Sequence, residues 1–172
     1  MKKLLLLALI FCATGAAANE VTDSLKANVN PICYNRLFLG AGVVAEKRHA
    51  PVALEVGYTR GFRMAAETRH YLEAGIDIEY ISGNGGGSLL AASVPFNYTY
   101  RIPVGTKGLT LSPYGGMALR VIMAGDTNSR LNFGLQTGLN VDYGRFAGGL
   151  VTHFNVASFF AVGVLLRVGV RF

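Results

Sequence analysis

The sequence predicts an all-β protein, folded as an eight-stranded antiparallel up-and-down transmembrane β-barrel. Three observations predict this fold. Apolar and polar residues alternate along one segment after another from residue 34 onward. Only 15% of the 172 residues are charged, against a usual share of about 25%, and glycine is abundant, with 22 residues. Because such a chain has few charges to present to water, we expect its apolar face to lie against lipid.

The first element along the chain is an amino-terminal targeting segment. Lys2 and Lys3 precede a short apolar run, and small residues that include Ala16 and Ala18 follow it. This order is typical of a secretory signal peptide, so we expect residues 1–18 to be cleaved after Ala18. An alternative makes Cys12 the lipid-modified first residue of a lipoprotein, but the preceding Phe11 is a poor match to the small residue that such a site needs.

Cleavage leaves a mildly basic chain with one cysteine. Without Lys2 and Lys3, 14 Lys+Arg stand against 10 Asp+Glu, a net charge of +4. That charge does not indicate a nucleic-acid partner. Residues 19–33 show no clear period and are expected to form a periplasmic lead-in to a barrel domain at 34–172. Cys33 has no internal partner for a disulfide, so it is either an inert thiol or the site of an intermolecular bond.

Eight segments with two-residue alternation follow. In residues 131–143 the odd positions are apolar apart from Thr137, whereas the even positions are Asn, Gly, Gln and Asp. The predicted strands are 35–45, 51–60, 70–81, 89–102, 108–123, 130–143, 145–155 and 158–172. The connections are short, and Gly144 alone is expected to form a tight hairpin. Since parallel crossovers need a dozen or more residues, consecutive strands should pair antiparallel.

Volume decides which face of these strands points outward. A soluble, lipocalin-type barrel would show the same alternation, but with its apolar face inside and its polar face outside. An eight-stranded barrel has an interior just wide enough for its side chains, so about forty apolar residues would not fit inside it. The opposite face is rich in glycine, and no predicted strand contains lysine. The sequence therefore predicts apolar residues facing lipid and polar residues inside.

The inward positions gather most of the charge in the predicted strands. These positions hold Glu55, Glu73, Asp77, Glu79 and Asp142 together with Arg101, Arg120, Arg145, Arg167 and Arg171. An unpaired charge in a narrow interior costs several kcal/mol, so the equal numbers predict an ion network that joins opposite walls. The expected role of this network is a structural plug. A narrow ion or small-solute pathway through it is the alternative.

Catalytic and cofactor motifs are sparse. His153 lies near one rim with Ser158 close in sequence, but no acid completes a triad. The histidines at 49, 70 and 153 lack metal-ligand spacing, and Gly83–Gly87 lacks the Lys and Ser/Thr of a phosphate loop. We therefore expect no enzymatic activity, no metal and no cofactor, with an outer-membrane lipid-modifying enzyme as the remaining alternative.

Barrel topology predicts where the rims lie. With both termini in the periplasm, the connections at 46–50, 82–88, 124–129 and 156–157 face outside. Lys47, Arg48 and Arg130 are expected near lipopolysaccharide phosphates there. Aromatic residues should form two partial girdles at the membrane interfaces. The expected periplasmic girdle is Tyr58, Tyr98, Tyr100, Tyr143, Phe146 and Phe172, and the outer one is Tyr80, Phe154 and Phe160.

Four features carry a resemblance to a known family: the terminal Phe172, the Val94-Pro95-Phe96 step, Pro113-Tyr114-Gly115, and the stretch from Gly134 to Gly144. With these, residues 34–172 resemble the small eight-stranded outer-membrane barrels of the OmpA and OmpX type, and more closely the PorT-like outer-membrane β-barrel domain family of Gram-negative bacteria.

The resemblance implies a role and a set of partners. It implies that Phe172, Val170 and Val168 form the signal that the barrel-assembly machinery reads, although Val170 stands where the family usually has Tyr. We expect a monomeric, non-enzymatic outer-membrane protein with a structural or interaction role and a plugged polar interior. Its expected partners are outer-membrane lipid, including lipopolysaccharide, the assembly machinery, and periplasmic or envelope proteins.

Overall fold

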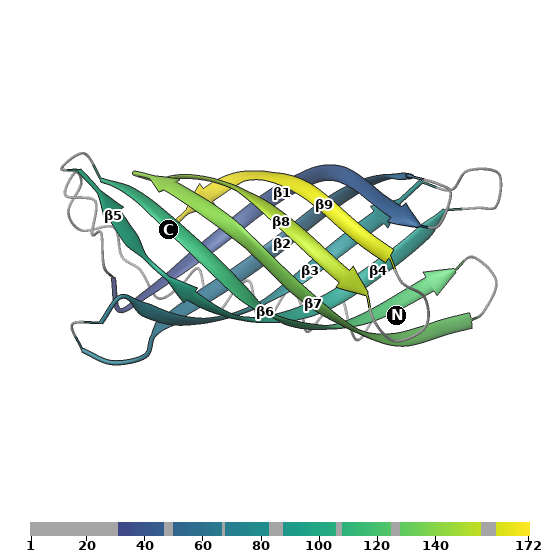
Figure 1. Ribbon diagram of the computed structural model, residues 1–172, viewed down its shortest axis with the longest axis horizontal. Coiled ribbons are helices and arrows are strands. Elements are labelled where there is room, and N and C mark those ends of the chain that lie inside the picture. Colours follow the sequence, from purple (N-terminus) through teal and green to yellow (C-terminus); the bar gives the residue numbers. More distant parts are fainter. Residues whose placement is uncertain are drawn as a thin grey trace.

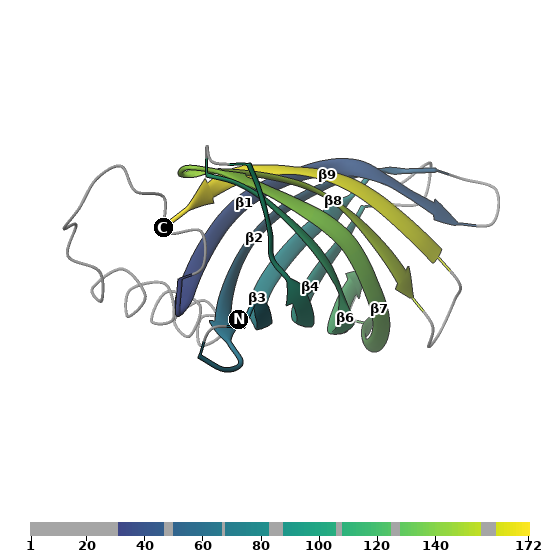
Figure 2. The ribbon, with the colours of Figure 1, turned by 60° about the vertical axis from the view of Figure 1, so that its left-hand side comes forward.

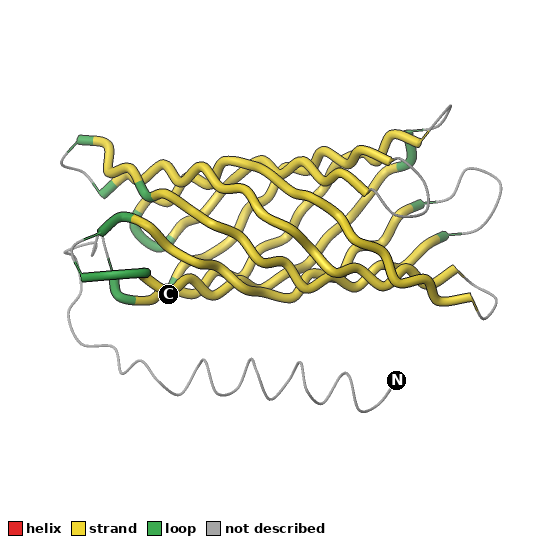
Figure 3. Tube along the Cα trace, turned by 60° about the horizontal axis from the view of Figure 1, so that its bottom comes forward, coloured by secondary structure: helices red, strands yellow, loops and turns green. Residues whose placement is uncertain are grey.

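Strands make up almost all of the structure. The computed structural model describes residues 31–46, 50–66, 68–82, 88–105, 108–124, 128–155 and 161–172. The strands are β1 (Cys33–Glu46), β2 (Val52–Arg63), β3 (His70–Ile81), β4 (Leu89–Tyr100), β5 (Ile102–Val104), β6 (Leu109–Ala124), β7 (Asn128–Tyr143), β8 (Phe146–Asn155) and β9 (Ala161–Arg171). Figure 3 shows that strands form the main part of the described chain. Among the described residues, no helix is long and apolar enough to cross a membrane.

The sheet closes on itself, which confirms the predicted eight-stranded barrel. The strand order is β4-β3-β2-β1-β9-β8-β7-β6-β5, and an additional β4–β6 pairing joins the two edges. Every pairing is antiparallel. The strands run obliquely to the long axis (Figure 1) and curve around a common interior (Figure 2). The β4–β6 pairing closes the sheet, so that the wall strands pair their backbone groups with one another, as a bilayer requires.

The predicted segment 89–102 is divided at Arg101 into β4 and the short β5. The register against β6 is unchanged across the division, because Thr99 lies opposite Tyr114 and Ile102 lies opposite Leu111. On the other side, the backbone N–H of Arg101 donates to the carbonyl of Arg69 at 2.9 Å, where β3 begins. β4 and β5 therefore act as one wall strand, and the barrel has eight walls.

Several predicted strand boundaries differ from those of the structure by a few residues. β1 begins at Cys33, so this residue belongs to the barrel and not to the lead-in. β2 continues to Arg63 because Phe62 and Arg63 still pair with Leu72 and Tyr71. The β7–β8 hairpin turn contains two residues, Gly144 and Arg145, and Gly144 adopts the positive φ of 59° that such a turn favours in glycine.

The two ends of the barrel are distinguished below by the residues of β9. The Phe172 end also carries the beginning of β1, the short β5 and the turn at Gly144 (Figure 1). The Ala161 end carries the ends of β1, β3 and β6. Exposed aromatic side chains gather at the Phe172 end, as predicted: Tyr98, Tyr100, Tyr143, Phe146 and Phe172.

The faces of the strands are those that the volume argument predicts. Large apolar side chains on the outside are among the most exposed in the protein, such as Leu131 at 71% and Val168 at 68%. Charged side chains on the inside are buried, and Asp142 is 0% exposed. A protein surrounded by water would reverse this order. The outer surface is therefore suited to lipid and not to water.

Several predicted features lie outside the described residues. These are the cleavage residues Ala16 and Ala18, the lead-in up to residue 30, the side chains of Lys47 and Arg48, the glycine loop 83–87, and Ser158 and Phe160.

Candidate functional site

The barrel interior is the candidate site, and its first part lies at the Phe172 end. Here Asp142 on β7 accepts hydrogen bonds from two arginines. Arg36 on β1 donates from Nε at 3.1 Å and from Nη2 at 2.8 Å, and Arg101 donates from Nη1 at 2.8 Å. Arg36 also donates from Nη1 to Glu73 on β3 at 2.7 Å. We call Tyr34, Arg36, Glu73, Arg101 and Asp142 the Asp142 cluster.

The ring of Tyr34 completes the Asp142 cluster. The guanidinium carbon of Arg36, also on β1, lies 4.6 Å from the ring centroid of Tyr34. The guanidinium carbon of Arg101, which lies between β4 and β5, is 4.7 Å from the same centroid. The Tyr34 hydroxyl donates to Glu73. The cluster therefore connects β1, β3 and β7 with the residue between β4 and β5. Its charges are compensated by partners on other strands, as buried charges require.

A second ion cluster, the Arg167 cluster, lies further along the interior. Arg167 on β9 holds Glu55 on β2 in a bidentate pair, with Nε–Oε2 at 2.8 Å and Nη2–Oε1 at 2.6 Å. Its Nη2 also lies 3.5 Å from Oδ2 of Asp77 on β3. The guanidinium carbon sits 4.2 Å from the ring centroid of Phe38. Bidentate geometry makes this one of the stronger contacts of the interior.

A third ion cluster, the Arg120 cluster, joins β6 to three other walls. Arg120 pairs with Glu79 on β3. It also donates from Nε to the Ser93 hydroxyl at 3.0 Å and from Nη1 to Oδ1 of Asn155 at 3.4 Å. The three clusters thus tie strands that are not neighbours in the sheet.

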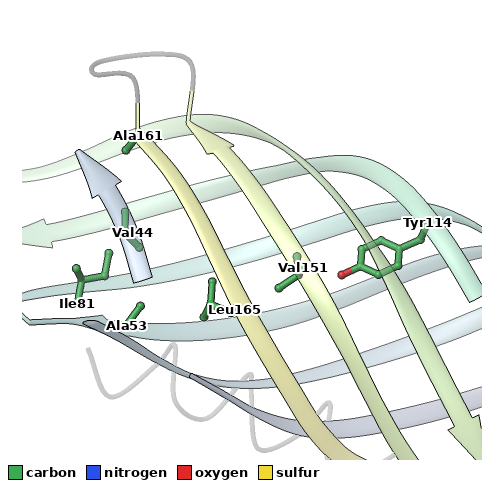
Figure 4. Packing of buried hydrophobic residues seen from close by; sticks show 7 residues of the cluster. All are labelled: Val44, Ala53, Ile81, Tyr114, Val151, Ala161 and Leu165. Atoms are coloured by element: carbon green, nitrogen blue, oxygen red, sulfur yellow. The ribbon is translucent and has the colours of Figure 1, made fainter. Parts of the chain in front are cut away.

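Towards the Ala161 end the interior becomes partly apolar. A buried hydrophobic group projects inward from β1, β2, β3, β6, β8 and β9, and it extends from Ala161 along the interior to Tyr114 on β6 (Figure 4). Its members are Val44, Ala53, Ile81, Tyr114, Val151, Ala161 and Leu165, with Leu89 packed against them. We call this the Leu165 group. The predicted polar interior is therefore only partly correct towards the Ala161 end, because these residues share the interior with the Arg120 cluster, whose Asn155 lies opposite Ala161.

A cavity of about 20 Å³ lies between the Asp142 and Arg167 clusters, and Arg36, Glu73, Asn97, Tyr114 and Arg167 are among the residues that line it. One water molecule needs about 10–15 Å³ of such space. The cavity is therefore large enough for a single water molecule and too small for a hydrated ion.

The structure brings together eight of the ten charged residues that the sequence placed inside: Glu55, Glu73, Asp77, Glu79, Arg101, Arg120, Asp142 and Arg167. Arg171 is only half-buried and donates to the carbonyl of Gly144 at 3.1 Å. Arg145 is exposed, so its inward placement is wrong, because the residue belongs to the hairpin turn and not to β8. The expected assembly residues Val168, Val170 and Phe172 point outward and are exposed.

Arg36 and Tyr34 are the important residues that sequence reasoning missed. Both share the parity of Gly40 and Gly42 on β1, which places all four inside. Counting back by two from Gly40 would have found Arg36. Its position near the start of a segment predicted to begin at residue 35 concealed it.

Catalytic chemistry has little support in the described residues. His153 is buried inside on β8 at 6% exposure, opposite Gln136 on β7, and its Nε2 has no hydrogen-bond partner. No carboxylate orients it through a hydrogen bond there. Within the described ranges, no group of three or more His, Cys, Asp and Glu side chains is placed to hold a metal ion.

Comparison with known proteins identifies the fold. No protein-family model and none of the curated proteins matches the chain. Among solved structures, Neisserial surface protein A matches with a TM-score of 0.66 at 10% identity, covering 82% of this chain and 96% of that one. The outer-membrane enzyme PagL matches with a TM-score of 0.63 at 13% identity, covering 78% and 97%. The N-terminal β-barrel domain of Pseudomonas aeruginosa OprF matches with a TM-score of 0.52 at 12% identity, covering 82% and 98%. The chain therefore has the fold of the small eight-stranded outer-membrane barrels.

Proposed function

We propose that this protein is a non-enzymatic, monomeric outer-membrane protein with a closed interior and a structural or interaction role. The observation that carries the proposal is the interior itself. Three ion clusters and the Leu165 group connect the walls, and the cavity between two of these clusters has room for one water molecule. Such an interior stabilises a barrel and leaves its outer surface and rims for contacts.

The outer surface supports the membrane placement. Exposed apolar side chains cover the walls, and aromatic residues gather at the Phe172 end, as is usual at a membrane interface. We place this end in the periplasm because its β7–β8 turn has only two residues, and periplasmic turns of such barrels are short. Lipopolysaccharide would then meet Lys47, Arg48 and the exposed Arg130 at the other end.

The further partners follow from the same placement. The outward row Val168, Val170 and Phe172 is available to the barrel-assembly machinery, and the Phe172 end to periplasmic or envelope proteins. Neither of the alternatives has comparable support. An ion pathway would have to pass charged side chains that are already paired, and an outer-membrane lipid-modifying enzyme would need catalytic groups that the described interior does not bring together.

Heat-modifiability on gels and planar-bilayer recording test the proposal on one refolded sample. We expect the unboiled protein to migrate differently from the boiled protein, and to give no discrete conductance steps. Incubation with lipid A should leave its mass spectrum unchanged. Stable conductance would replace the closed barrel by a channel, and loss of an acyl chain from lipid A would make the protein an enzyme. Solubility without detergent together with no gel shift would contradict the membrane placement.

A further inference from the structure

Arg60 is exceptional on the outer surface. In the described strands, Arg60 is the one Asp, Glu, Lys or Arg residue that the alternation of its strand places on the outward face. The outward residues of β2 are, in order, Val52, Leu54, Val56, Tyr58, Arg60 and Phe62. A charge on the lipid-facing side of a barrel costs about 2–4 kcal/mol at the bilayer midplane and about 0–1 kcal/mol near the interfaces. The change from aliphatic residues to Tyr and Arg therefore marks the interface on the Phe172 side.

No residue of the described ranges neutralises this charge. None of the ion pairs formed by the described residues includes Arg60, and its Nε is buried without a hydrogen-bond partner. The interior arginines contrast with it, since Arg36, Arg101, Arg120 and Arg167 all have carboxylate partners. A guanidinium group that lies at the membrane interface and has no anionic partner among the described residues is available to bind an anion of the membrane.

The surroundings of Arg60 orient it. Its guanidinium carbon lies 5.1 Å from the ring centroid of Phe62, which is 48% exposed. Its strand neighbours are Asn35 on β1 and the small Ala74 on β3. Asn35 is already engaged, because Tyr58 donates to its side-chain oxygen at 2.6 Å and its amide donates to the Phe172 carbonyl at 3.3 Å. No polar neighbour on β1 or β3 thus competes for the guanidinium.

We propose that Arg60, supported by Phe62, binds the phosphate of an anionic glycerophospholipid at the interface on the Phe172 side. Guanidinium groups pair well with phosphate oxygens, and stacking on an aromatic ring favours the cation in a partly desolvated place. Phospholipid, and not lipopolysaccharide, is the ligand because the proposed topology puts this end in the periplasmic leaflet. The inference rests on that proposed membrane placement.

Native mass spectrometry of protein extracted from defined bilayers tests the site. Vesicles of phosphatidylcholine with phosphatidylglycerol form one arm, phosphatidylcholine alone the second, and phosphatidylcholine with lipopolysaccharide the third. We expect retained phosphatidylglycerol on the wild type, and about tenfold less on Arg60→Gln, which loses a charge-assisted contact. Arg60→Lys should retain an intermediate amount, because it keeps the charge without the planar group.

Arg145→Gln is the matched control, since Arg145 is an exposed arginine at the same end without an ion pair to a described acid. It should retain lipid like the wild type. The site would be overturned if the wild type and Arg60→Gln retained equal amounts of phosphatidylglycerol. It would also be overturned if Arg60→Gln and Arg145→Gln lost equal amounts of this lipid. Preferential, Arg60-dependent retention of lipopolysaccharide would overturn the phospholipid assignment. The gel shift of the wild type and of each variant is measured on the same samples. If the membrane placement were wrong, the wild type itself would show no gel shift, so this failure is distinguishable from failure of the lipid site.

Discussion

Two sets of side chains, the ion clusters and the Leu165 group, fill the barrel interior in different ways. At the Phe172 end, Asp142 on β7 is held by Arg36 on β1, although β8 and β9 lie between these strands in the sheet. Towards the Ala161 end, Val44, Ile81 and Leu165 meet by packing alone. Ion pairs are directional and specify which walls face each other, whereas packing depends on volume. The comparison indicates that the ion clusters, of which the Arg120 cluster reaches the Ala161 end, fix the geometry of the barrel, and that the Leu165 group seals it.

The energetic consequences of the two fillings also differ. Removing one partner from a buried ion cluster leaves an uncompensated charge, so the loss exceeds what the pair contributes to stability. Removing an apolar side chain costs its transfer free energy and a term for the cavity. The chain has no Trp, so unfolding cannot be followed by Trp fluorescence. The gel shift between folded and unfolded protein is therefore the suitable readout for urea unfolding of each variant in lipid vesicles.

The largest effect should come from Asp142→Ala. This change leaves the guanidinium groups of Arg36 and Arg101 without their shared acceptor. We expect a loss of about 3–5 kcal/mol in the free energy of unfolding. The control is Arg145→Ala, which removes an exposed side chain in a turn and should change stability by less than about 0.5 kcal/mol. Comparable urea midpoints for the two variants would mean that the Asp142 cluster contributes little.

Leu165→Ala is the corresponding change in the Leu165 group. Leu165 is 0% exposed and packs in the Leu165 group, so we expect a loss of about 2–4 kcal/mol from lost contacts and the cavity. Leu166→Ala is the matched control, because Leu166 is 67% exposed on the outward face of the same strand. Equal urea sensitivity of the two leucine variants would contradict the sealing role of the interior group.

A smaller effect should distinguish Gly42 and Gly163, two inward glycines opposite members of the Leu165 group. A Cβ on Gly42 would overlap the carbonyl of Val164, which belongs to the backbone of β9. A Cβ on Gly163 would meet Val44 Cγ2 at 3.4 Å and Leu165 Cδ1 at 3.7 Å, both ordinary contacts. We expect Gly42→Ala to cost about 1–3 kcal/mol and Gly163→Ala to be tolerated in the same urea titration. If Gly163→Ala were instead the more destabilising change, the close approach of β1 and β9 at Gly42 would not limit the size of the side chain there.

Much of the fold could be predicted because two-residue alternation determines both the strands and their faces. Residues 131–143 illustrate this, since every odd position there points away from the interior. The same parity placed Glu55, Asp77 and Arg167 inside. Parity failed for Arg145, where the two-residue turn shifted the start of β8.

The pairing of charges could not be predicted from the sequence. Alternation says which face a residue occupies but not how far opposite walls are displaced, because the tilt and stagger of the strands set that. Arg36 and Asp142 therefore meet across the interior without any sequence signal that joins them. The Leu165 group escaped notice for a related reason. Its inward residues, such as Val44 and Ala53, lie in strands where outward neighbours are also apolar, which obscures the alternation.

A double-mutant cycle of Arg36→Ala and Asp142→Ala tests the central claim, that ion pairs across the interior hold the barrel walls together. The free energies of unfolding of the wild type, the two single variants and the double variant would be measured by urea titration in lipid vesicles. We predict a coupling free energy of about 1–3 kcal/mol, so that the double variant is less destabilised than the sum of the single variants. Additive single effects would contradict the account, because the two side chains would then stabilise the barrel independently of each other.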